Sequence, residues 1–79
     1  MNKNINDKNY YYNIVRVNIR KYREEKGFTR KMLAEKIDYS EDYIKEIESL
    51  SKKKGFSIVV LGRIADVLGV DIKDFFNVW

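Results

Sequence analysis

The sequence predicts an all-α domain of five helices with a flexible N-terminal arm. Apolar residues recur at helical spacings of three and four from Ile14 onward, and capping residues and glycines divide this pattern into short segments. The 79-residue chain contains no proline to interrupt a helix and no cysteine for a disulfide. A chain of this length without disulfides depends on efficient helix packing.

The first 13 residues form the expected arm. They are polar and rich in asparagine, and they show no helical periodicity. We therefore expect residues 1–13 to be flexible and residues 14–79 to fold as one domain. The stretch 10–17 also contains β-branched and aromatic residues, which leaves open a short strand that docks on a partner subunit.

The first three helices follow from apolar spacing and local caps. The first begins at Ile14 and ends before Gly27, a residue suited to the left-handed stop position. Thr29 caps a second helix over residues 30–37, and Ser40 caps a third over residues 41–48. The side chains expected to face the core from these helices are Val15, Ile19, Tyr22, Leu33, Ala34, Ile37, Ile44 and Ile47.

Two further helices complete the domain. Ser57 caps the fourth, which Gly69 ends, and Asp71 caps a last turn or two. The residues expected to face inward from the fourth helix are Ile58, Leu61, Ile64, Ala65 and Leu68, and the last turns contain Ile72, Phe75 and Phe76. Asp38 occupies the turn between the second and third helices, where aspartate tolerates a positive φ.

Composition excludes several function classes. Without histidine or cysteine the chain cannot form a zinc module or a Ser-His-Asp hydrolase site, and we expect neither a metal nor a cofactor. Its carboxylates lie mostly at caps and helix surfaces and no glycine-rich phosphate loop follows a strand, so we do not expect an enzyme. No apolar run approaches the length of a membrane span and no signal peptide is visible, which predicts a cytoplasmic protein without membrane contact.

Charge is distributed unevenly along the chain. Residues 1–37 carry ten Lys/Arg against four Asp/Glu (+6), residues 38–50 carry one against five (−4), and residues 51–79 carry five against three (+2). A basic body therefore surrounds one acidic segment, which contains the predicted third helix.

Two short helices separated by a tight turn describe a helix-turn-helix, whose second helix enters the DNA major groove. The segment NIRKYREEKGFTRKMLAEKIDYSEDYIKEIE, residues 18–48, resembles the XRE family of lambda repressor/Cro-like helix-turn-helix proteins, and the resemblance continues through IADVLGVDIKDFF, residues 64–76. It covers about residues 14–76. It implies a five-helix lambda repressor-like DNA-binding domain and a sequence-specific transcriptional regulator, a repressor, that binds double-stranded DNA.

The resemblance assigns roles to particular positions. It implies an ion pair between Arg23 and Glu48 that joins the first and third helices. It implies phosphate contacts at the start of the second helix, from Thr29, Arg30 and Lys31, where backbone N–H groups attract anions. The base-reading positions that it implies on the third helix are Ser40, Glu41, Asp42, Tyr43, Lys45 and Glu46.

Several basic and aromatic residues have both a functional and a structural interpretation. The loop residues Lys52, Lys53 and Lys54 either contact phosphates or form a solvated loop. Tyr43 either touches the duplex or supports the turn before its helix. The first-helix cations Arg16, Arg20 and Lys21 either contribute to binding or solubilise an outer face.

Three features depart from the family pattern. The third helix is acidic, with Glu46 where many relatives carry Lys or Arg, Asp38 stands where Gly is usual, and the loop after Glu48 is about two residues longer than is common. The longer basic loop can compensate for the acidic helix by adding phosphate contacts. Glu41 and Asp42 also suit the helix dipole without reading bases.

The −4 charge of residues 38–50 motivates an alternative function. This alternative is a protein-interaction module, such as an inhibitor, antitoxin or co-regulator, whose acidic helix binds a basic partner protein.

The C-terminus carries more apolar residues than a closing helix needs. Phe76, Val78 and Trp79 are expected to form a homodimer seam, since dimers read two half-sites about 34 Å apart. The other interpretation is that Trp79 folds back on its own core.

Overall fold

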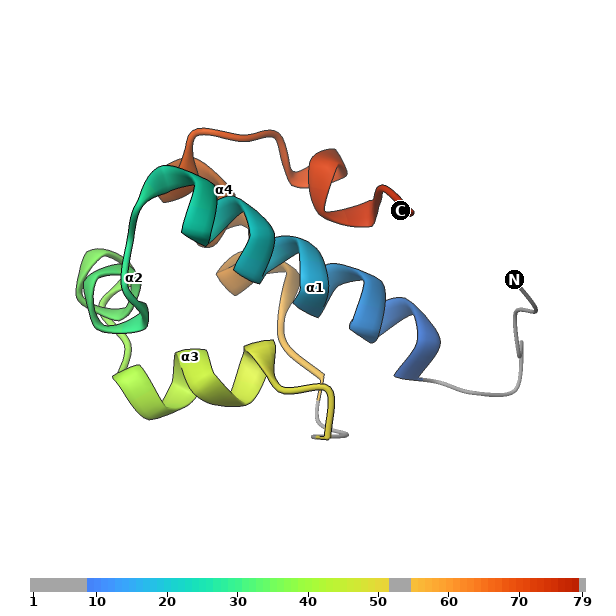
Figure 1. Cartoon of the computed structure of the whole chain (residues 1–79), viewed down its shortest axis with the longest axis horizontal. Helices are drawn as coiled ribbons and strands as arrows, with labels where there is room; N and C mark the ends of the chain where they lie inside the picture. The colour runs from blue at the N-terminus through green and yellow to red at the C-terminus, as the bar shows by residue number, and fades with distance from the viewer. Residues whose placement is uncertain (1–8, 52–54, 79) are drawn as a thin grey trace.

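The computed structural model describes residues 9–51 and 55–78, and these form four α-helices and one 3-10 helix (Figure 1). The helices are α1 (Asn9–Lys26), α2 (Arg30–Ile37), α3 (Glu41–Glu48), α4 (Ile58–Leu68) and η1 (Ile72–Phe76). No strand occurs within the described ranges. The predicted all-α class is therefore confirmed, with the last helix a 3-10 helix.

One core joins all five elements. Ile19, Leu33, Ile44, Ile64 and Phe75 come one from each element in chain order, and none of them is exposed to solvent. α1 crosses the domain and contacts α3, α4 and η1, while α2 packs against α3 and α4. α2 and α3 are therefore held as a pair on one side of α1.

The predicted caps form hydrogen bonds that fix the helix bounds. The side-chain oxygens of Thr29, Ser40 and Ser57 each accept a backbone N–H three residues on, at 3.1 Å. These bonds satisfy N–H groups that have no partner within the helix. Left-handed residues follow α1 and α4 at Gly27 (φ 79°) and Gly69 (φ 71°), as predicted.

The start of α1 differs from the prediction. The helix begins at Asn9, five residues before Ile14, so residues 9–13 are helical and the strand considered for 10–17 is wrong. Tyr12 packs edge to face on Phe56, with ring centroids 5.3 Å apart. Tertiary contacts of this kind override the β-propensity of a short aromatic run. The remainder of the predicted arm, residues 1–8, lies outside the described residues.

One residue predicted to face the core lies at the surface instead. Ile58 is 66% exposed because it stands in the first position of α4, where no preceding turn of the helix covers it. Phe76, which was expected in the homodimer seam, is 49% exposed in the last position of η1, and Trp79 of the same seam lies outside the described residues. Val60 is buried in α4, although its spacing did not predict it.

Candidate nucleic-acid interface

The tight turn between α2 and α3 sets the orientation of α3 relative to α2. Asp38 adopts φ 63° and ψ 46°, the left-handed conformation expected of it, and the Tyr39 N–H returns to the Ala34 carbonyl at 2.9 Å. Ser40 then caps α3. Ile44 and Ile47 bury the inner face of α3, which leaves the opposite face outside the core.

The outer face of α3 carries the residues predicted to read bases. Ser40, Glu41, Asp42 and Lys45 are exposed, while Tyr43 and Glu46 are half-buried. Lys45 Nζ lies 3.9 Å from Glu41 Oε2, one helical turn apart, and both side chains stay about half exposed. Such a loose surface pair does little to hold either side chain, so both can reorient toward a ligand.

Tyr43 has an aromatic neighbour that the sequence reasoning missed. Its ring stacks on that of Tyr39, with centroids 4.7 Å apart and an interplanar angle of 23°. Burial first, and then the nearby Tyr39 and Glu46, raise the pKa of Tyr43 above its ordinary value. The Tyr43 hydroxyl therefore remains a donor at neutral pH, and both interpretations of this residue stay compatible with its half-buried position. The available signal for Tyr39 is its place directly before the Ser40 cap, a position whose hydrophobic side chain often packs on the helix that follows.

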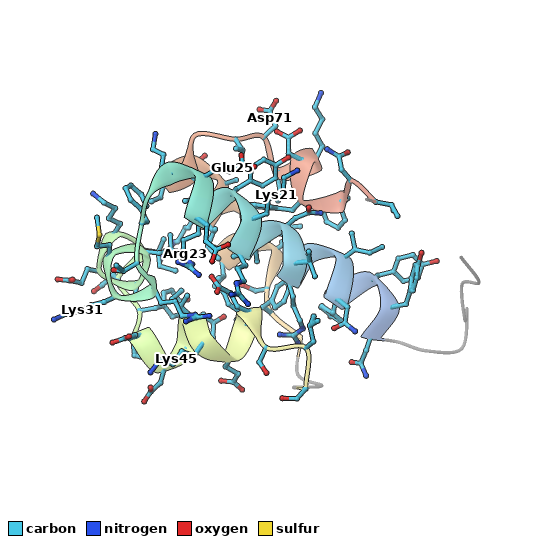
Figure 2. The ribbon with its side chains drawn as sticks, viewed as in Figure 1. Lys21, Arg23, Glu25, Lys31, Lys45 and Asp71 are labelled. Atoms are coloured by element: carbon cyan, nitrogen blue, oxygen red, sulfur yellow. The ribbon has the colours of Figure 1, made fainter. Side chains whose placement is uncertain are left out.

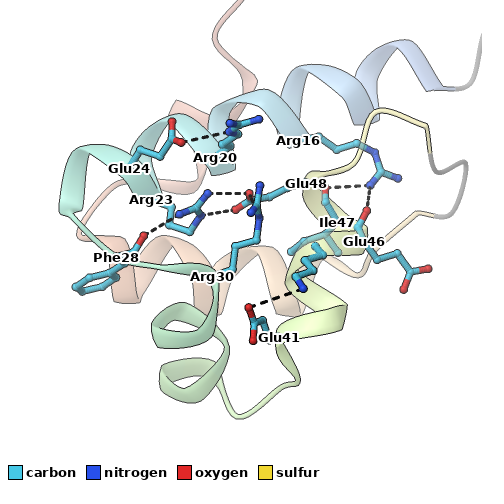
Figure 3. A network of polar contacts seen from close by, with 11 residues as sticks. Arg16, Arg20, Arg23, Glu24, Phe28, Arg30, Glu41, Glu46, Ile47 and Glu48 are labelled. Carbon is cyan, nitrogen blue, oxygen red and sulfur yellow. Dashed lines mark hydrogen bonds and ion pairs between the residues drawn. The ribbon is translucent and has the colours of Figure 1, made fainter.

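The C-terminal end of α3 is held by a buried ion cluster, shown in Figure 3. Glu48 accepts from Arg23 through two hydrogen bonds, Nε to Oε2 at 2.6 Å and Nη2 to Oε1 at 3.0 Å. The predicted pair thus exists and is bidentate. Arg30 adds a third bond, Nε to Oε1 at 3.1 Å, which ties the start of α2 to the same carboxylate.

Arg16 holds the same end of α3 from α1, a role the sequence reasoning missed. It is 1% exposed, which contradicts its interpretation as a solubilising residue. Its Nη1 donates to the carbonyls of Glu46 at 3.0 Å and Ile47 at 2.9 Å, so it satisfies carbonyl oxygens at a helix end (Figure 3). The guanidinium also lies 5.3 Å from the centroid of Phe56. Burial lowers the pKa of Arg16 from its ordinary value.

Three cations surround one depression beside α3. Arg20 from α1, Arg30 from α2 and Lys45 from α3 line it together with Glu48, Ser49 and Leu50. Arg20 pairs with Glu24 at 3.3 Å, but both side chains remain more than half exposed. Arg30 is 36% exposed in spite of its bond to Glu48. The sequence left Arg20 open between a binding role and a solubilising role, because nothing in the linear pattern shows that it approaches α3.

The remaining predicted contacts are distributed around this depression. Thr29 and Lys31 are exposed at the start of α2, and Figure 2 shows Lys31 pointing away from the domain. The loop residues Lys52, Lys53 and Lys54 lie outside the described residues. The described basic side chains thus flank an outer α3 face that is itself acidic.

Comparisons with known proteins agree with this geometry. A helix-turn-helix family model matches residues 19–75. No curated protein sequence matches the chain significantly. Within the described ranges, no helix combines the length and apolar character needed to cross a membrane.

Several solved structures share the fold. The clp gene regulator ClgR from Corynebacterium glutamicum is 28% identical, with a TM-score of 0.75 over 82% of this chain and 67% of that one. The biofilm master regulator SinR, solved in complex with DNA, is 30% identical, with a TM-score of 0.71 over 80% of this chain and 98% of that one. The restriction-modification controller C.AhdI from Aeromonas hydrophila is 20% identical, with a TM-score of 0.74 over 82% and 96%, and supports the fold alone.

Proposed function

We propose that this chain, which belongs to the helix-turn-helix family, is a sequence-specific DNA-binding transcriptional regulator that acts as a repressor. The family membership agrees with the resemblance to XRE proteins that its sequence shows. ClgR and SinR, which it resembles, are described as regulators and not as enzymes. In this proposal α3 enters the major groove. A bound domain represses by covering the DNA that the transcription machinery needs, and a cytoplasmic location, as predicted from the sequence, is consistent with this role.

The observation that carries the proposal is the depression lined by Arg20, Arg30 and Lys45 beside the exposed face of α3. Three cations from three helices line it together with Glu48, and one of them, Arg30, is the first residue of α2. This combination suits a phosphate oxygen, since cations and helix N-termini both attract anions. A phosphate held at that point would set the depth at which α3 enters the groove.

The proposal divides the predicted residues between two roles. Thr29, Arg30 and Lys31 would hold the DNA backbone, together with Arg20 and with the loop residues 52–54. The residues proposed to face base edges are Ser40, Glu41, Asp42, Tyr43 and Glu46, whereas Lys45, which lines the depression, is proposed to contact a phosphate. A carboxylate accepts from the N4 amino group of cytosine, and a tyrosine ring contacts a thymine methyl. The acidic character of α3 would then favour particular bases while the flanking cations supply affinity.

Binding to duplex DNA from the region upstream of the protein's own gene tests the proposal. Fluorescence anisotropy is measured across a salt series on this duplex and on a scrambled duplex of equal composition. The comparison separates non-specific electrostatic binding from sequence-specific binding. We expect a steep decrease in affinity with salt and tighter binding to the native duplex. Absence of binding at low salt, on this duplex and on a random duplex library, would contradict the proposed function.

The variant Lys45→Gln measures how much a cation of the depression contributes to DNA affinity. Loss of one phosphate contact should reduce the slope of log affinity against log salt by about 0.9. Lys73→Gln is the matched control, because Lys73 is exposed on η1 and does not line the depression. Equal slopes for the two variants would remove Lys45 from the phosphate site.

The acidic outer face of α3 favours a second candidate, a protein-interaction module that binds a basic partner. Glu41, Asp42 and Glu46 all lie on this face, two of them exposed. Glu46→Lys separates the candidates. A DNA reader should gain about tenfold in non-specific DNA affinity, since a repelling charge becomes an attracting one. A protein-binding face should instead lose its partner, as measured by co-purification from the source cells.

A further inference from the structure

Tyr39 and Tyr43 form a pair of stacked rings at the N-terminal end of α3. Their centroids are 4.7 Å apart and the interplanar angle is 23°. Tyr43 packs against the hydrophobic core, and the backbone N–H of Tyr39 donates to the Ala34 carbonyl at 2.9 Å. Tyr39 is therefore held on two sides although it is 38% exposed. A ring that is already ordered loses little conformational freedom when a ligand contacts it.

The tyrosine pair and the cationic depression lie on opposite edges of α3. Residues 39, 43 and 46 are spaced by four and three, so they follow one edge of the helix. Residues 41, 45 and 48 have the same spacing and follow the other edge, which borders the depression. A second hollow lies between the two edges and is lined by Asp42, Lys45, Glu46 and Ser49. α3 thus presents one edge bordered by cations and one aromatic edge.

The charge on the aromatic edge disfavours a phosphate. Glu46 follows Tyr43 by three residues and, after burial and Tyr39, is a cause of the raised pKa of Tyr43, so its carboxylate lies near this ring. A carboxylate repels phosphate oxygens but not an uncharged group. In unmodified B-DNA the major groove presents one apolar group, the C5-methyl of thymine. The aromatic edge therefore matches a base methyl group better than it matches the DNA backbone.

We propose that Tyr39 is a specificity-determining residue whose ring contacts the 5-methyl group of a pyrimidine in the major groove. The inference rests on the proposed function and adds a residue of the turn before α3 to the positions predicted to read bases. Tyr43 covers one face of the Tyr39 ring and acts as a positioning residue, and the methyl group packs on the exposed remainder of that ring. The methyl group belongs to thymine or to 5-methylcytosine, which carry it on the same ring carbon.

The place of Tyr39 in the chain suits this contact. The N-terminal residues of a recognition helix are those that contact base edges, and Tyr39 directly precedes the Ser40 cap of α3. Tyr43 is half-buried and has one face against Tyr39, so less of its ring is available to a ligand. With a phosphate in the depression on one edge of α3, the other edge turns toward the base pairs.

Replacement of thymine by deoxyuridine tests the inference on the wild-type chain. Deoxyuridine pairs with adenine as thymine does but lacks the 5-methyl group. A duplex selected by the chain from a random library is resynthesised with one thymine replaced at a time, and fluorescence anisotropy at fixed salt gives each Kd. We expect the Kd to rise about fourfold at one or more positions, as for the loss of one buried methyl-sized group.

Replacement of cytosine by 5-methylcytosine in the same duplex distinguishes the two sources of the methyl group. A loss of affinity with deoxyuridine identifies thymine as the base that Tyr39 contacts. A gain of about fourfold at one cytosine identifies 5-methylcytosine, and binding would then depend on methylation of the DNA.

Three variants assign the effect to the Tyr39 ring. Tyr39→Ala should bind the duplex with and without the methyl group equally, whereas Tyr39→Phe, which keeps the ring, should retain the fourfold difference. Tyr11→Ala is the matched control, because Tyr11 is an exposed tyrosine on α1, and it should also retain the difference. Circular dichroism verifies that each variant folds, and the base replacements on the wild-type chain need no variant.

Three results would overturn the inference. These are sequence-specific binding that no deoxyuridine or 5-methylcytosine alters, a methyl effect that Tyr39→Ala retains in full, and a methyl effect that Tyr39→Phe also removes. In each case specific DNA binding persists, so the proposed function stands while this inference fails. Absence of binding to every duplex would contradict the proposed function and this inference together.

Discussion

The two ends of α3 differ in how their charged side chains are held. At its C-terminal end, Glu48 is buried and accepts three hydrogen bonds from Arg23 and Arg30, and Arg16 binds the last carbonyls. At its N-terminal end, Glu41 is exposed, and its Oε2 lies 3.9 Å from the Nζ of Lys45 one turn further along the helix. The same charged residue types thus form a rigid support at one end and an adaptable surface at the other.

Burial, and not charge alone, determines whether a charged residue of α3 supports the helix or forms its adaptable surface. A buried pair that loses one partner leaves an uncompensated charge, whereas an exposed pair is screened by water and salt. The helix can therefore change its outer residues at small cost in stability, while its position depends on a few inner contacts. Three substitutions test this comparison, in order of decreasing effect.

Glu48→Gln should have the largest effect on stability. It removes the negative charge that balances Arg23 and Arg30 while preserving side-chain size. We expect the free energy of unfolding to fall by about 3 kcal/mol, as for other broken buried pairs. Urea denaturation measures it, with Glu41→Gln as the matched control on the same helix, for which a change within about 0.5 kcal/mol is expected. Similar losses at the two positions would refute the distinction between the ends of α3.

Arg16→Met should have an intermediate effect. Methionine preserves much of the apolar stem but removes both hydrogen bonds to the α3 carbonyls. Loss of charged donors to buried acceptors should reduce the unfolding free energy by about 2 kcal/mol. Arg20→Met, an exposed arginine on the same helix, provides the comparison and should change stability little. If the two variants unfold at the same urea concentration, Arg16 does not anchor α3.

Asp38→Gly should have the smallest effect, and in the opposite direction. Residue 38 has φ 63°, a conformation that glycine adopts without strain. We expect the free energy of unfolding to rise by about 0.5 kcal/mol. The same substitution at Asp66, inside α4, should lower it, because glycine is a poor helix former. A decrease at both positions would mean that the Asp38 side chain contributes more than its backbone strain costs.

Local sequence signals predicted the helix bounds from α2 onward. Thr29, Ser40 and Ser57 act on backbone groups three residues away, so a linear pattern contains both partners of each hydrogen bond. The predicted start of α1 at Ile14 was wrong because the contact between Tyr12 and Phe56 joins residues far apart in the chain, which a linear pattern does not show. The exposed position of Ile58 was missed because periodicity gives the face of a residue but not whether a neighbour covers it.

The support of α3 was only partly predictable. Family resemblance implied the pair of Arg23 and Glu48, but the additional bond from Arg30 depends on how α2 turns against α3. Arg16 offered a usable signal, since positions 16, 19 and 23 are spaced by three and four and share one buried face of α1. The assignment of phosphate and base contacts to individual residues stays a prediction.

The inward placement of all the anchors of α3 has a practical consequence for redesign. Ile44, Ile47 and Glu48 fix the helix, whereas positions 41, 42 and 45 make no buried contact. Randomising those three positions would give a library whose members share one scaffold and differ in the surface they present. Such a library would allow new target preferences to be selected without a separate search for stability.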